Sequence, residues 1–328
     1  MSGLSDKLYQ RGWLNYLLYP FSLLYRSIIV IRRWMYRRGY LQSFPAKVPV
    51  IVVGNISVGG TGKSPLTAWL VNYLKSQGKN PGIVSRGYGG KRDAGAALTV
   101  TANSDPAVVG DEAVMLVQQT QCPMVVSSDR AAAVSQLQKL DGIDLIVSDD
   151  GLQHYAMQRD IEIAVIDAKR GLQNGFCLPA GPLREPAARL NEVDFVISNG
   201  NSNHADYHMQ IDSMQILKVS DPLQSLSQQR LKASKINALA GIGHPQRFFD
   251  LLTEQGLEFT PYIFPDHHRF VTSNIDFDDD SIVLMTEKDA VKCRSFADDR
   301  HWYVAITVKP DDRFIESIHK KIESYNAI

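Results

Sequence analysis

The sequence predicts an α/β fold built on a parallel sheet, and three observations lead to this class. Apolar runs of strand-forming residues alternate with helical patterns from residue 48 onward. A glycine-rich bend joins the first of these strands to the first helix, and two adjacent aspartates close a later strand. Repeated strand–helix–strand units produce parallel sheets that helices cover on both faces. With 328 residues, the chain is long enough for a second, smaller α/β domain.

Charge and cysteine content narrow the possible functions. The formal net charge is zero, so the composition gives no argument for nucleic-acid binding, and we expect no nucleic-acid partner. The three cysteines, Cys122, Cys177 and Cys293, are far apart and have no paired spacing. They therefore predict neither a disulfide framework nor a zinc site, and they are typical of a reducing compartment.

Residues 1–44 form an apolar and basic segment. The stretch 13–31 is almost continuously apolar, interrupted by Pro20 and Arg26, and residues 1–47 carry eight Lys or Arg against the single acid Asp6. An internal arginine disfavours a full membrane span, so we favour a helix that lies in or dips into one leaflet, although a span stays open. The alternative is an ordinary buried first helix. The basic cluster would hold anionic head groups and keep the rest of the chain on the cytoplasmic side; it consists of Arg32, Arg33, Arg37 and Arg38.

Residues 48–64 predict a phosphate-binding loop, as in P-loop NTPases: an apolar strand at 48–53, a glycine-rich bend, and Lys63-Ser64 at the start of a helix. Backbone N–H groups of such a loop surround phosphate oxygens, the lysine reaches the outer phosphates, and the serine ligates Mg²⁺. Ser57 stands where the general motif has glycine, and the alternative is a glycine-rich turn that binds nothing. The expected nucleotide-binding residues are Ser57, Val58, Gly59, Gly60, Thr61, Gly62, Lys63 and Ser64.

Polar side chains gather after the other strands of this sheet, expected at 81–85, 124–127 and 144–148, with helices from 111 and 129. In parallel sheets, ligands bind beyond the carboxyl ends of the strands. Asp149 and Asp150 at the end of an apolar strand fit a magnesium site next to a phosphate loop. Other candidates at these ends have structural alternatives as caps or flexible turns; they are Arg86, Tyr88, Asp111, Glu112 and Arg130.

The second half predicts further strands at 161–166, 194–198, 235–239, 281–285 and 302–308, and helices at 245–255, 287–292 and 312–325. Residues 178–186, rich in proline and glycine, are expected to form a wall of the cleft or part of a linker. Polar residues alternate along the stretch 204–219, a pattern that predicts a two-sided or edge strand. We therefore divide the chain into the N-terminal segment 1–44, a phosphate-loop core 45–155 and a smaller α/β domain 156–328. The sequence leaves open whether the last helix packs back on the core.

Six segments together resemble one known family: residues 53–65, 85–89, 110–112, 149–154, 264–268 and 286–292. In this order they resemble tetraacyldisaccharide 4′-kinase, the lipid A 4′-kinase of Gram-negative bacteria, over nearly the whole chain. The serine at position 57 is shared by that family's loop, so it strengthens the resemblance.

The resemblance implies an enzyme of lipid A (lipopolysaccharide) biosynthesis, a phosphotransferase with ATP and Mg²⁺ as cofactors. It would phosphorylate the 4′-hydroxyl of a tetraacylated glucosamine disaccharide 1-phosphate to give lipid IVA. The expected location is the cytoplasmic face of the bacterial inner membrane, whose lipid surface and lipid A precursor would be its partners. Other functions left open are a P-loop GTPase or ATPase that acts on a protein partner, and a non-catalytic membrane scaffold.

The resemblance also implies roles for individual residues. Asp111 would be the catalytic base, assisted by His267 or His268, and which histidine does so stays open. Lys63 and Arg130 would face the phosphates. Ser64, Asp149 and Asp150 would serve the metal. The residues expected around the acceptor substrate are Asn55, Arg86, Tyr88, Glu112, Gln153 and His154.

Overall fold

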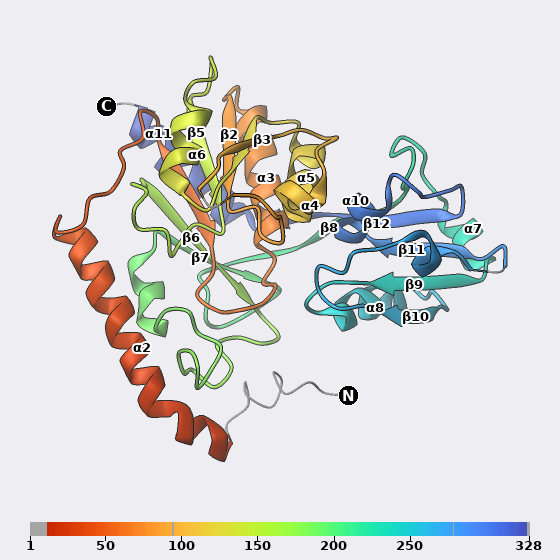
Figure 1. Cartoon of the computed structure of the whole chain (residues 1–328), viewed down its shortest axis with the longest axis horizontal. Coiled ribbons are helices and arrows are strands. Elements are labelled where there is room, and N and C mark those ends of the chain that lie inside the picture. Colours follow the sequence, from red (N-terminus) through yellow and green to blue (C-terminus); the bar gives the residue numbers. More distant parts are fainter. Residues whose placement is uncertain (1–11, 94, 278, 327–328) are drawn as a thin grey trace.

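The computed structural model describes residues 12–93, 95–277 and 279–326. Within them, twelve strands form one continuous sheet in the order β10-β9-β11-β12-β8-β7-β6-β1-β5-β2-β4-β3. Figure 1 shows two lobes of unequal size, which the long strands β8 and β12 connect. The predicted α/β class is confirmed.

The larger lobe contains the phosphate loop between β1 (Val50–Gly54) and α3 (Lys63–Ser76). Both faces of β1 are buried, as expected for a parallel strand that helices cover on either side. The sheet departs from a purely parallel one at its edge, where β3 runs antiparallel to β4. The other elements of this lobe are β2 (Pro81–Ser85), β3 (Leu98–Val100), α4 (Pro106–Val109), α5 (Asp111–Thr120), β4 (Met124–Val126), α6 (Arg130–Leu137), β5 (Leu145–Asp149), β6 (Ile161–Asp167), η1 (Ala187–Glu192) and β7 (Phe195–Asn199).

The smaller lobe continues the same sheet. Strand β8 (Tyr207–Lys218) pairs in parallel with β7 and antiparallel with β12 (His301–Pro310). The alternating stretch 204–219 therefore forms an interior strand that links the lobes, and the edge position on this side belongs to β10. The remaining elements are α7 (Gln228–Lys232), β9 (Ile236–Ala240), α8 (Pro245–Glu254), β10 (Thr260–Ile263), α9 (Thr272–Ile275), β11 (Ile282–Thr286) and α10 (Glu287–Cys293).

The predicted domain limits stay a prediction. Strands β6 and β7 follow the predicted boundary at residue 155 but belong to the sheet of the larger lobe, where β6 pairs with β1 and β7 pairs with β6. The last helix, α11 (Asp312–Asn326), returns to the larger lobe, where Phe314 and Ile318 are buried in the main core cluster. The Tyr325 hydroxyl donates a hydrogen bond of 2.8 Å to the Asp160 carbonyl.

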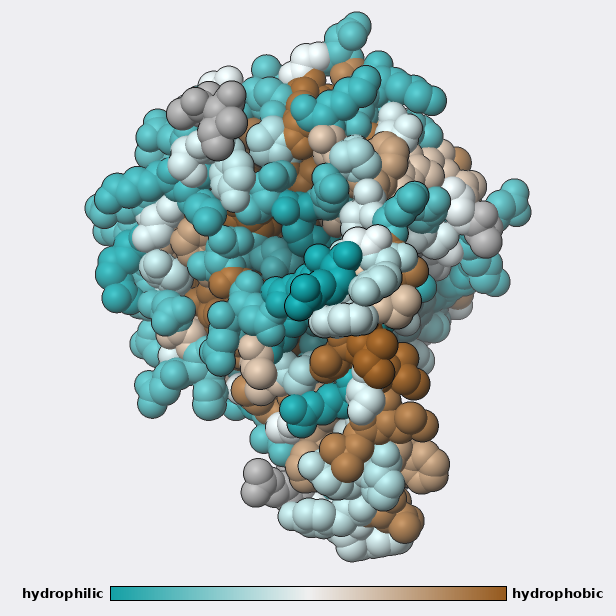
Figure 2. Space-filling view, turned by 90° about the vertical axis from the view of Figure 1, so that its left-hand side faces the viewer, coloured by the Kyte–Doolittle hydropathy of each residue, from teal (hydrophilic) through white to brown (hydrophobic). Residues whose placement is uncertain are grey.

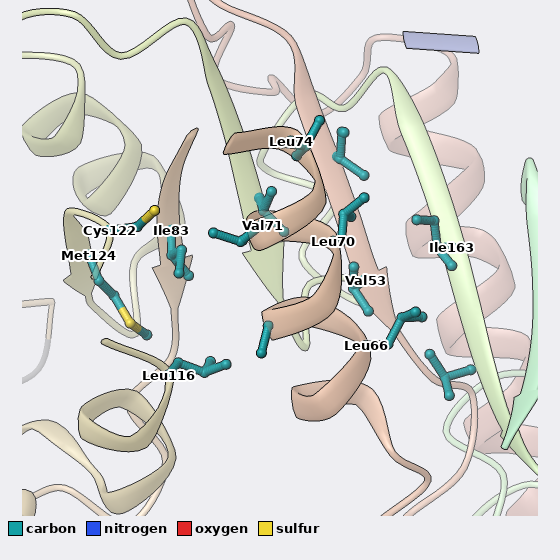
Figure 3. Close-up of a cluster of buried hydrophobic side chains, with 14 of the residues drawn as sticks. Val53, Leu66, Leu70, Val71, Leu74, Ile83, Leu116, Cys122, Met124 and Ile163 are labelled. Atoms are coloured by element: carbon teal, nitrogen blue, oxygen red, sulfur yellow. The ribbon is translucent and has the colours of Figure 1, made fainter. Parts of the chain in front are cut away.

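The main core lies between α3, α5 and the sheet. Figure 3 shows Leu66 and Leu70 of α3 beside Val53 of β1, with Ile163 of β6 next to them. Leu66 and Leu70 are fully buried, and their spacing of four residues places them on one face of the helix. This packing fixes the first turn of α3, and with it the phosphate loop, against the carboxyl end of β1.

Helix α2 (Trp13–Arg37) lies along one side of the larger lobe, at the lower left of Figure 1. Among the described helices it alone is long and apolar enough to cross a membrane, judged by length and composition. Its N-terminal half is fastened by hydrogen bonds from Asn15 to the Ala180 carbonyl, from Ser22 to the Cys177 carbonyl and from Tyr25 to the Arg184 carbonyl. Residues 1–11 of the predicted N-terminal segment, with Lys7 and Arg11, lie outside the described residues.

The outer face of α2 is apolar and exposed, which an ordinary core helix would not be. Figure 2 shows hydrophobic surface gathered on the projecting lower part of the molecule, where Figure 1 places this helix. Because water solvates such a surface unfavourably, a continuous exposed apolar face indicates a contact partner. The exposed apolar residues of the helix are Trp13, Tyr16, Leu17, Tyr19, Phe21, Leu23, Leu24, Ile28, Val30, Ile31 and Trp34.

Candidate active site

The phosphate loop is held in shape by its own side chains. Gly59 and Gly62 have positive φ angles of 90° and 96°, which glycine adopts without strain. The buried Asn55 side chain crosses the loop and donates to Thr61 Oγ1 at 3.2 Å and to the Gly59 carbonyl at 3.4 Å. Its Oδ1 atom has no hydrogen-bond partner among the described residues. The glycines and Asn55 thus fix a rigid turn that directs backbone groups inward.

The proline- and glycine-rich connection 178–186 braces the loop from outside. The Val58 amide donates to the Pro182 carbonyl at 2.9 Å, and Ser57 forms an isolated bridge with Leu183. The Arg184 amide donates to the Ile56 carbonyl at 2.7 Å. Ser57 therefore lies where the loop pairs with this connection.

Lys63 and the two aspartates meet at the mouth of the loop. Lys63 Nζ lies 3.6 Å from Asp150 Oδ1, and Arg184 Nη1 lies 3.1 Å from Asp150 Oδ2. Burial raises the pKa of Asp150, but the charges of Lys63 and Arg184 outweigh it, so this pKa lies below its ordinary value. Asp150 is thus ionised at neutral pH.

Asp149 ends β5 and is almost fully buried, where its Oδ1 accepts a hydrogen bond of 2.9 Å from Thr67. Burial, together with the charges of Glu112 and Asp150, raises the pKa of Asp149 to about 7. Thr67 is three residues after Ser64, so the two residues are neighbours on the surface of α3. Two carboxylates and a hydroxyl beside a phosphate loop are the donor set that Mg²⁺ takes together with phosphate oxygens. No group of three or more His, Cys, Asp or Glu side chains with metal-site geometry occurs in the described part of the chain.

Arg130 is buried behind this pair. Its Nη1 donates to the Ser127 carbonyl at 2.6 Å and its Nη2 to the Asp149 carbonyl at 3.5 Å. Burial lowers the pKa of Arg130 to about 10, which leaves it charged at neutral pH. Burial and the Arg130 charge lower the pKa of His154 to about 3, and the Arg86 charge adds to this. His154 is therefore neutral, and Arg86 lies near both residues.

Asp111 and His267 meet across the two lobes. Asp111, the first residue of α5, is buried, and its Oδ2 lies 3.0 Å from His267 Nδ1. Burial raises the pKa of Asp111, but the His267 hydrogen bond and the charges of Lys288 and Lys292 outweigh it and bring it below its ordinary value. The hydrogen bond to Asp111 raises the pKa of His267.

His268 faces another way. Its Nε2 lies 3.1 Å from Asn274 Oδ1, and its ring packs against Phe264 and Phe270. Of the two histidines, His267 therefore contacts Asp111, whereas His268 belongs to the packing of the smaller lobe.

The other predicted residues surround this centre. The ring of Tyr88, which is exposed, lies 5.0 Å from the His267 ring, and Lys288 Nζ lies 3.0 Å from Glu112 Oε1. Gln153 Nε2 donates to the Asn55 carbonyl at 3.0 Å and to Glu185 at 2.7 Å. Gln153 therefore connects the strand end that carries the aspartates to the phosphate loop.

The sequence interpretation missed a group of side chains beside the loop, formed by Arg170, Asp167 and His244. Arg170, after β6, donates through Nη2 to the Gly60 carbonyl, and its Nη1 lies 2.7 Å from His244 Nε2. The Asp167 carboxylate lies between two arginines, with its Oδ2 3.5 Å from Arg170 Nε and 3.1 Å from Arg247 Nη1. The signal was present in part, because Asp167 and Arg170 follow an apolar strand as the other site residues do. Only the fold reveals that His244, before α8, meets them.

Comparisons with known proteins agree with this geometry. A family model described as tetraacyldisaccharide-1-P 4′-kinase matches residues 14–323. The tetraacyldisaccharide 4′-kinase of Alkalilimnicola ehrlichii is 44% identical over 322 residues, covering 96% of this chain and 95% of the relative. That of Methylobacillus flagellatus is 47% identical over 309 residues, covering 94% and 91%.

A solved structure is similar over almost the same length. The "apo" form of LpxK from Aquifex aeolicus in complex with ATP has 27% sequence identity and a TM-score of 0.79, covering 95% of this chain and 99% of the other. These matches confirm the resemblance inferred from the six motifs.

Proposed function

The chain belongs to the tetraacyldisaccharide-1-P 4′-kinase family and is a kinase, and on this basis we propose the reaction in detail. The γ-phosphoryl group of ATP is transferred to the 4′-hydroxyl of a tetraacylated glucosamine disaccharide 1-phosphate at a membrane surface, which gives lipid IVA. The observation that carries this proposal is the Asp111–His267 pair, because Glu112, the neighbour of Asp111, is close enough to Asp149 for its charge to raise the Asp149 pKa.

ATP binds with its phosphates on the backbone N–H groups of residues 59–62, and Lys63 reaches the outer phosphates. The ATP in the Aquifex aeolicus structure supports this nucleotide. Arg170, fastened to the Gly60 carbonyl, holds the loop in the conformation that presents these amides. Positioning of the phosphates is most of what phosphoryl transfer needs from a protein.

Asp111 is the base that accepts the proton of the 4′-hydroxyl. A sugar hydroxyl loses its proton only as the bond to phosphorus forms, so a carboxylate with a low pKa is basic enough late in the step. The His267 hydrogen bond of 3.0 Å orients the carboxylate and keeps it ionised. His267 is therefore a positioning residue, whereas Asp111 touches the reacting group.

Ser64, Asp149 and Asp150 are the residues that would hold Mg²⁺, and the ion would supply neutralisation of phosphate charge. The buried Arg130 adds a fixed positive charge behind the two aspartates. The acceptor sugar lies among Asn55, Arg86, Tyr88, Glu112, Gln153 and His154. The neutral His154 and the amide of Gln153 suit hydrogen bonds with sugar hydroxyls.

The reaction takes place at the cytoplasmic face of the inner membrane, with lipid A precursor and the lipid surface as partners, and the exposed apolar face of α2 supports this part of the proposal. Because the acceptor carries four acyl chains, it stays in the membrane, and the enzyme reaches it there through this helix. No nucleic acid takes part.

The test is transfer of phosphate from ATP in the presence of Mg²⁺ to a purified lipid A precursor disaccharide, with full-length protein in detergent. We expect a 4′-phosphorylated lipid, and Lys63→Ala should abolish its formation. Turnover of GTP without lipid phosphorylation would instead support an NTPase that acts on a protein. The structure offers no guanine-reading group at 286–289, because Asp289 is fully buried and accepts hydrogen bonds from Thr286 and the Gly241 amide.

A further inference from the structure

A second cavity lies outside the candidate active site, between the C-terminal end of α2 and the segment 155–162. Its volume is about 260 Å³, and four arginines line it: Arg33, Arg37, Arg159 and Arg189. Tyr155 and Glu162 also line it, and Tyr155 directly follows His154 of the candidate active site. We refer to it below as the arginine cavity.

Arg189 gives the first evidence that the arginine cavity binds a ligand. Its side chain is 1% exposed, its Nη2 donates to Glu162, and its Nε lies 3.4 Å from Glu185. Its Nη1 has no hydrogen-bond partner among the described residues. A buried guanidinium donor without a partner is costly, so this group is suited to an anionic acceptor that enters the cavity.

Arg33 and Arg37 give the second piece of evidence that the arginine cavity binds a ligand. One turn apart on α2, both donate to the same carboxylate, that of Glu192 in η1, with Arg37 Nη2 2.6 Å from Glu192 Oε2. The two guanidinium groups therefore already converge on one oxyanion. A phosphate group presents more oxygen acceptors than a carboxylate and pairs with several arginines at once.

The position of the cavity indicates where such a phosphate comes from. The arginines lie on the same end of α2 as Val30, Ile31 and Trp34, which are exposed apolar residues. If this apolar face lies in the membrane, the arginine cavity opens at the level of the lipid head groups, where basic side chains meet lipid phosphates.

We propose that the arginine cavity binds the phosphate group of an anionic membrane phospholipid and so fixes the enzyme in one orientation on the bilayer. This inference rests on the membrane-surface action proposed above and adds a specific site to it. The bound head group displaces Glu192 from Arg33 and Arg37 and supplies the acceptor that Arg189 lacks. A lipid in this cavity keeps the neighbouring segment 152–159, with Gln153 and His154, facing the membrane-borne acceptor.

The experiment compares full-length protein binding to vesicles of phosphatidylcholine with and without about one fifth phosphatidylglycerol. Arg33→Gln and Arg37→Gln remove charges that line the cavity, and Arg38→Gln is the matched control, because Arg38 is exposed at the same helix end and does not line it. Since a hydrogen bond between charged groups contributes about a factor of ten or more to binding, we expect about tenfold weaker binding to anionic vesicles for each lining variant. For Arg38→Gln we expect less than about a twofold change, because it alters only the general attraction between basic residues and the membrane.

Glu192→Gln tests the competition directly and should strengthen binding to anionic vesicles, because it frees Arg33 and Arg37 for the lipid. A folding defect would not produce this gain. Arg37 is largely exposed, so its variant is expected to fold even if Arg33→Gln does not. Inorganic phosphate, added to the vesicle assay, should compete only weakly, since it lacks the anchoring acyl chains.

Four results would overturn the proposal, each for a different reason. Equal losses in the lining variants and in Arg38→Gln would mean diffuse attraction without a site. Binding of wild-type protein to neutral and anionic vesicles alike would remove the head-group site and leave membrane association intact, whereas no vesicle binding at all would remove both. An unchanged vesicle affinity with a raised KM for the acceptor would assign the cavity to the acceptor's own 1-phosphate.

Discussion

At the scale of single residues, the site depends on charges that the two lobes bring within hydrogen-bond distance. Asp111 begins a helix of the larger lobe and His267 follows a strand of the smaller one, yet their side chains are 3.0 Å apart. His267 has a positive φ of 56°, unusual for a non-glycine residue and typical of strained functional positions. The pair therefore forms only when both lobes are in place.

The replacement Asp111→Asn tests the base. It preserves the shape of the side chain but cannot accept the hydroxyl proton, so kcat should fall by about 10² to 10⁴ while the KM for ATP changes little. Steady-state kinetics with lipid acceptor in detergent measure both. Asp105→Asn is the control, because asparagine replaces aspartate well as the cap of α4. Near-normal turnover of Asp111→Asn would remove this residue as the base.

At the scale of elements, two attachments determine what the site presents. The first attachment fixes the phosphate loop. Arg170, after the end of β6, donates to the loop, and His244, at the start of α8, contacts Arg170. The second attachment holds α2, whose side chains donate hydrogen bonds to the carbonyl groups of residues 177, 180 and 184, while its apolar face stays exposed. Neither attachment involves a residue that the sequence interpretation marked as catalytic.

The replacement Arg170→Gln should release the loop. Because the Gly60 carbonyl loses its donor, the backbone amides are less ordered for phosphate, and we expect the KM for ATP to rise about tenfold with a smaller change in kcat. Nucleotide titration together with kinetics separates these effects. Arg313→Gln, at an exposed arginine of α11, serves as the comparison. An unchanged KM for ATP would show that the loop holds its shape without Arg170.

The replacement Leu24→Glu tests the apolar face of α2. Leu24 is 62% exposed, so the change should leave the melting temperature near that of wild type. Placing a carboxylate in a membrane interface is unfavourable, and sedimentation with vesicles should weaken by about tenfold or more. Leu223→Glu, at a leucine that is 95% exposed in the smaller lobe, should bind vesicles as wild type does. Equal binding by both variants would contradict membrane contact through this face.

At the scale of the whole molecule, the sheet runs without a break through both lobes, so their relative position depends on β8, β12 and the contacts beside them. One such contact joins α5 to α10, where Gln119 Nε2 donates to Glu287 Oε2 at 2.7 Å. The Gln119 Oε1 atom has no partner among the described residues. Burial raises the pKa of Glu287 to about 7, although the hydrogen bond from Gln119 lowers it, so the buried position favours the protonated form.

Stability should therefore depend on pH through Glu287. The pKa of Glu287 is higher in the folded protein than the ordinary value of 4.5, so its stabilising protonation is complete below pH 4.5 and is lost as pH rises through about 7. The loss amounts to about 3 kcal/mol at most. Glu287→Gln is neutral at every pH and still accepts a hydrogen bond from Gln119, so its free energy of unfolding should exceed that of wild type increasingly from pH 5 to pH 8.

Chemical unfolding at several pH values measures this difference. Glu258→Gln, at an exposed glutamate of the smaller lobe, should show no comparable trend. If the difference between Glu287→Gln and wild type stays constant across this range, the buried position does not favour a protonated carboxyl group.

The sequence by itself determined the features that local chemistry specifies. Glycines with the Lys63-Ser64 pair predict the phosphate loop, the alternation of apolar patterns predicts the α/β class, and the end of an apolar strand places Asp149 and Asp150, because each depends on neighbouring residues only. The tertiary structure alone decided that His267 meets Asp111 and that Arg170 and His244 meet the loop. These pairs are more than 70 residues apart along the chain, and only the packing of the lobes on one continuous sheet brings them together.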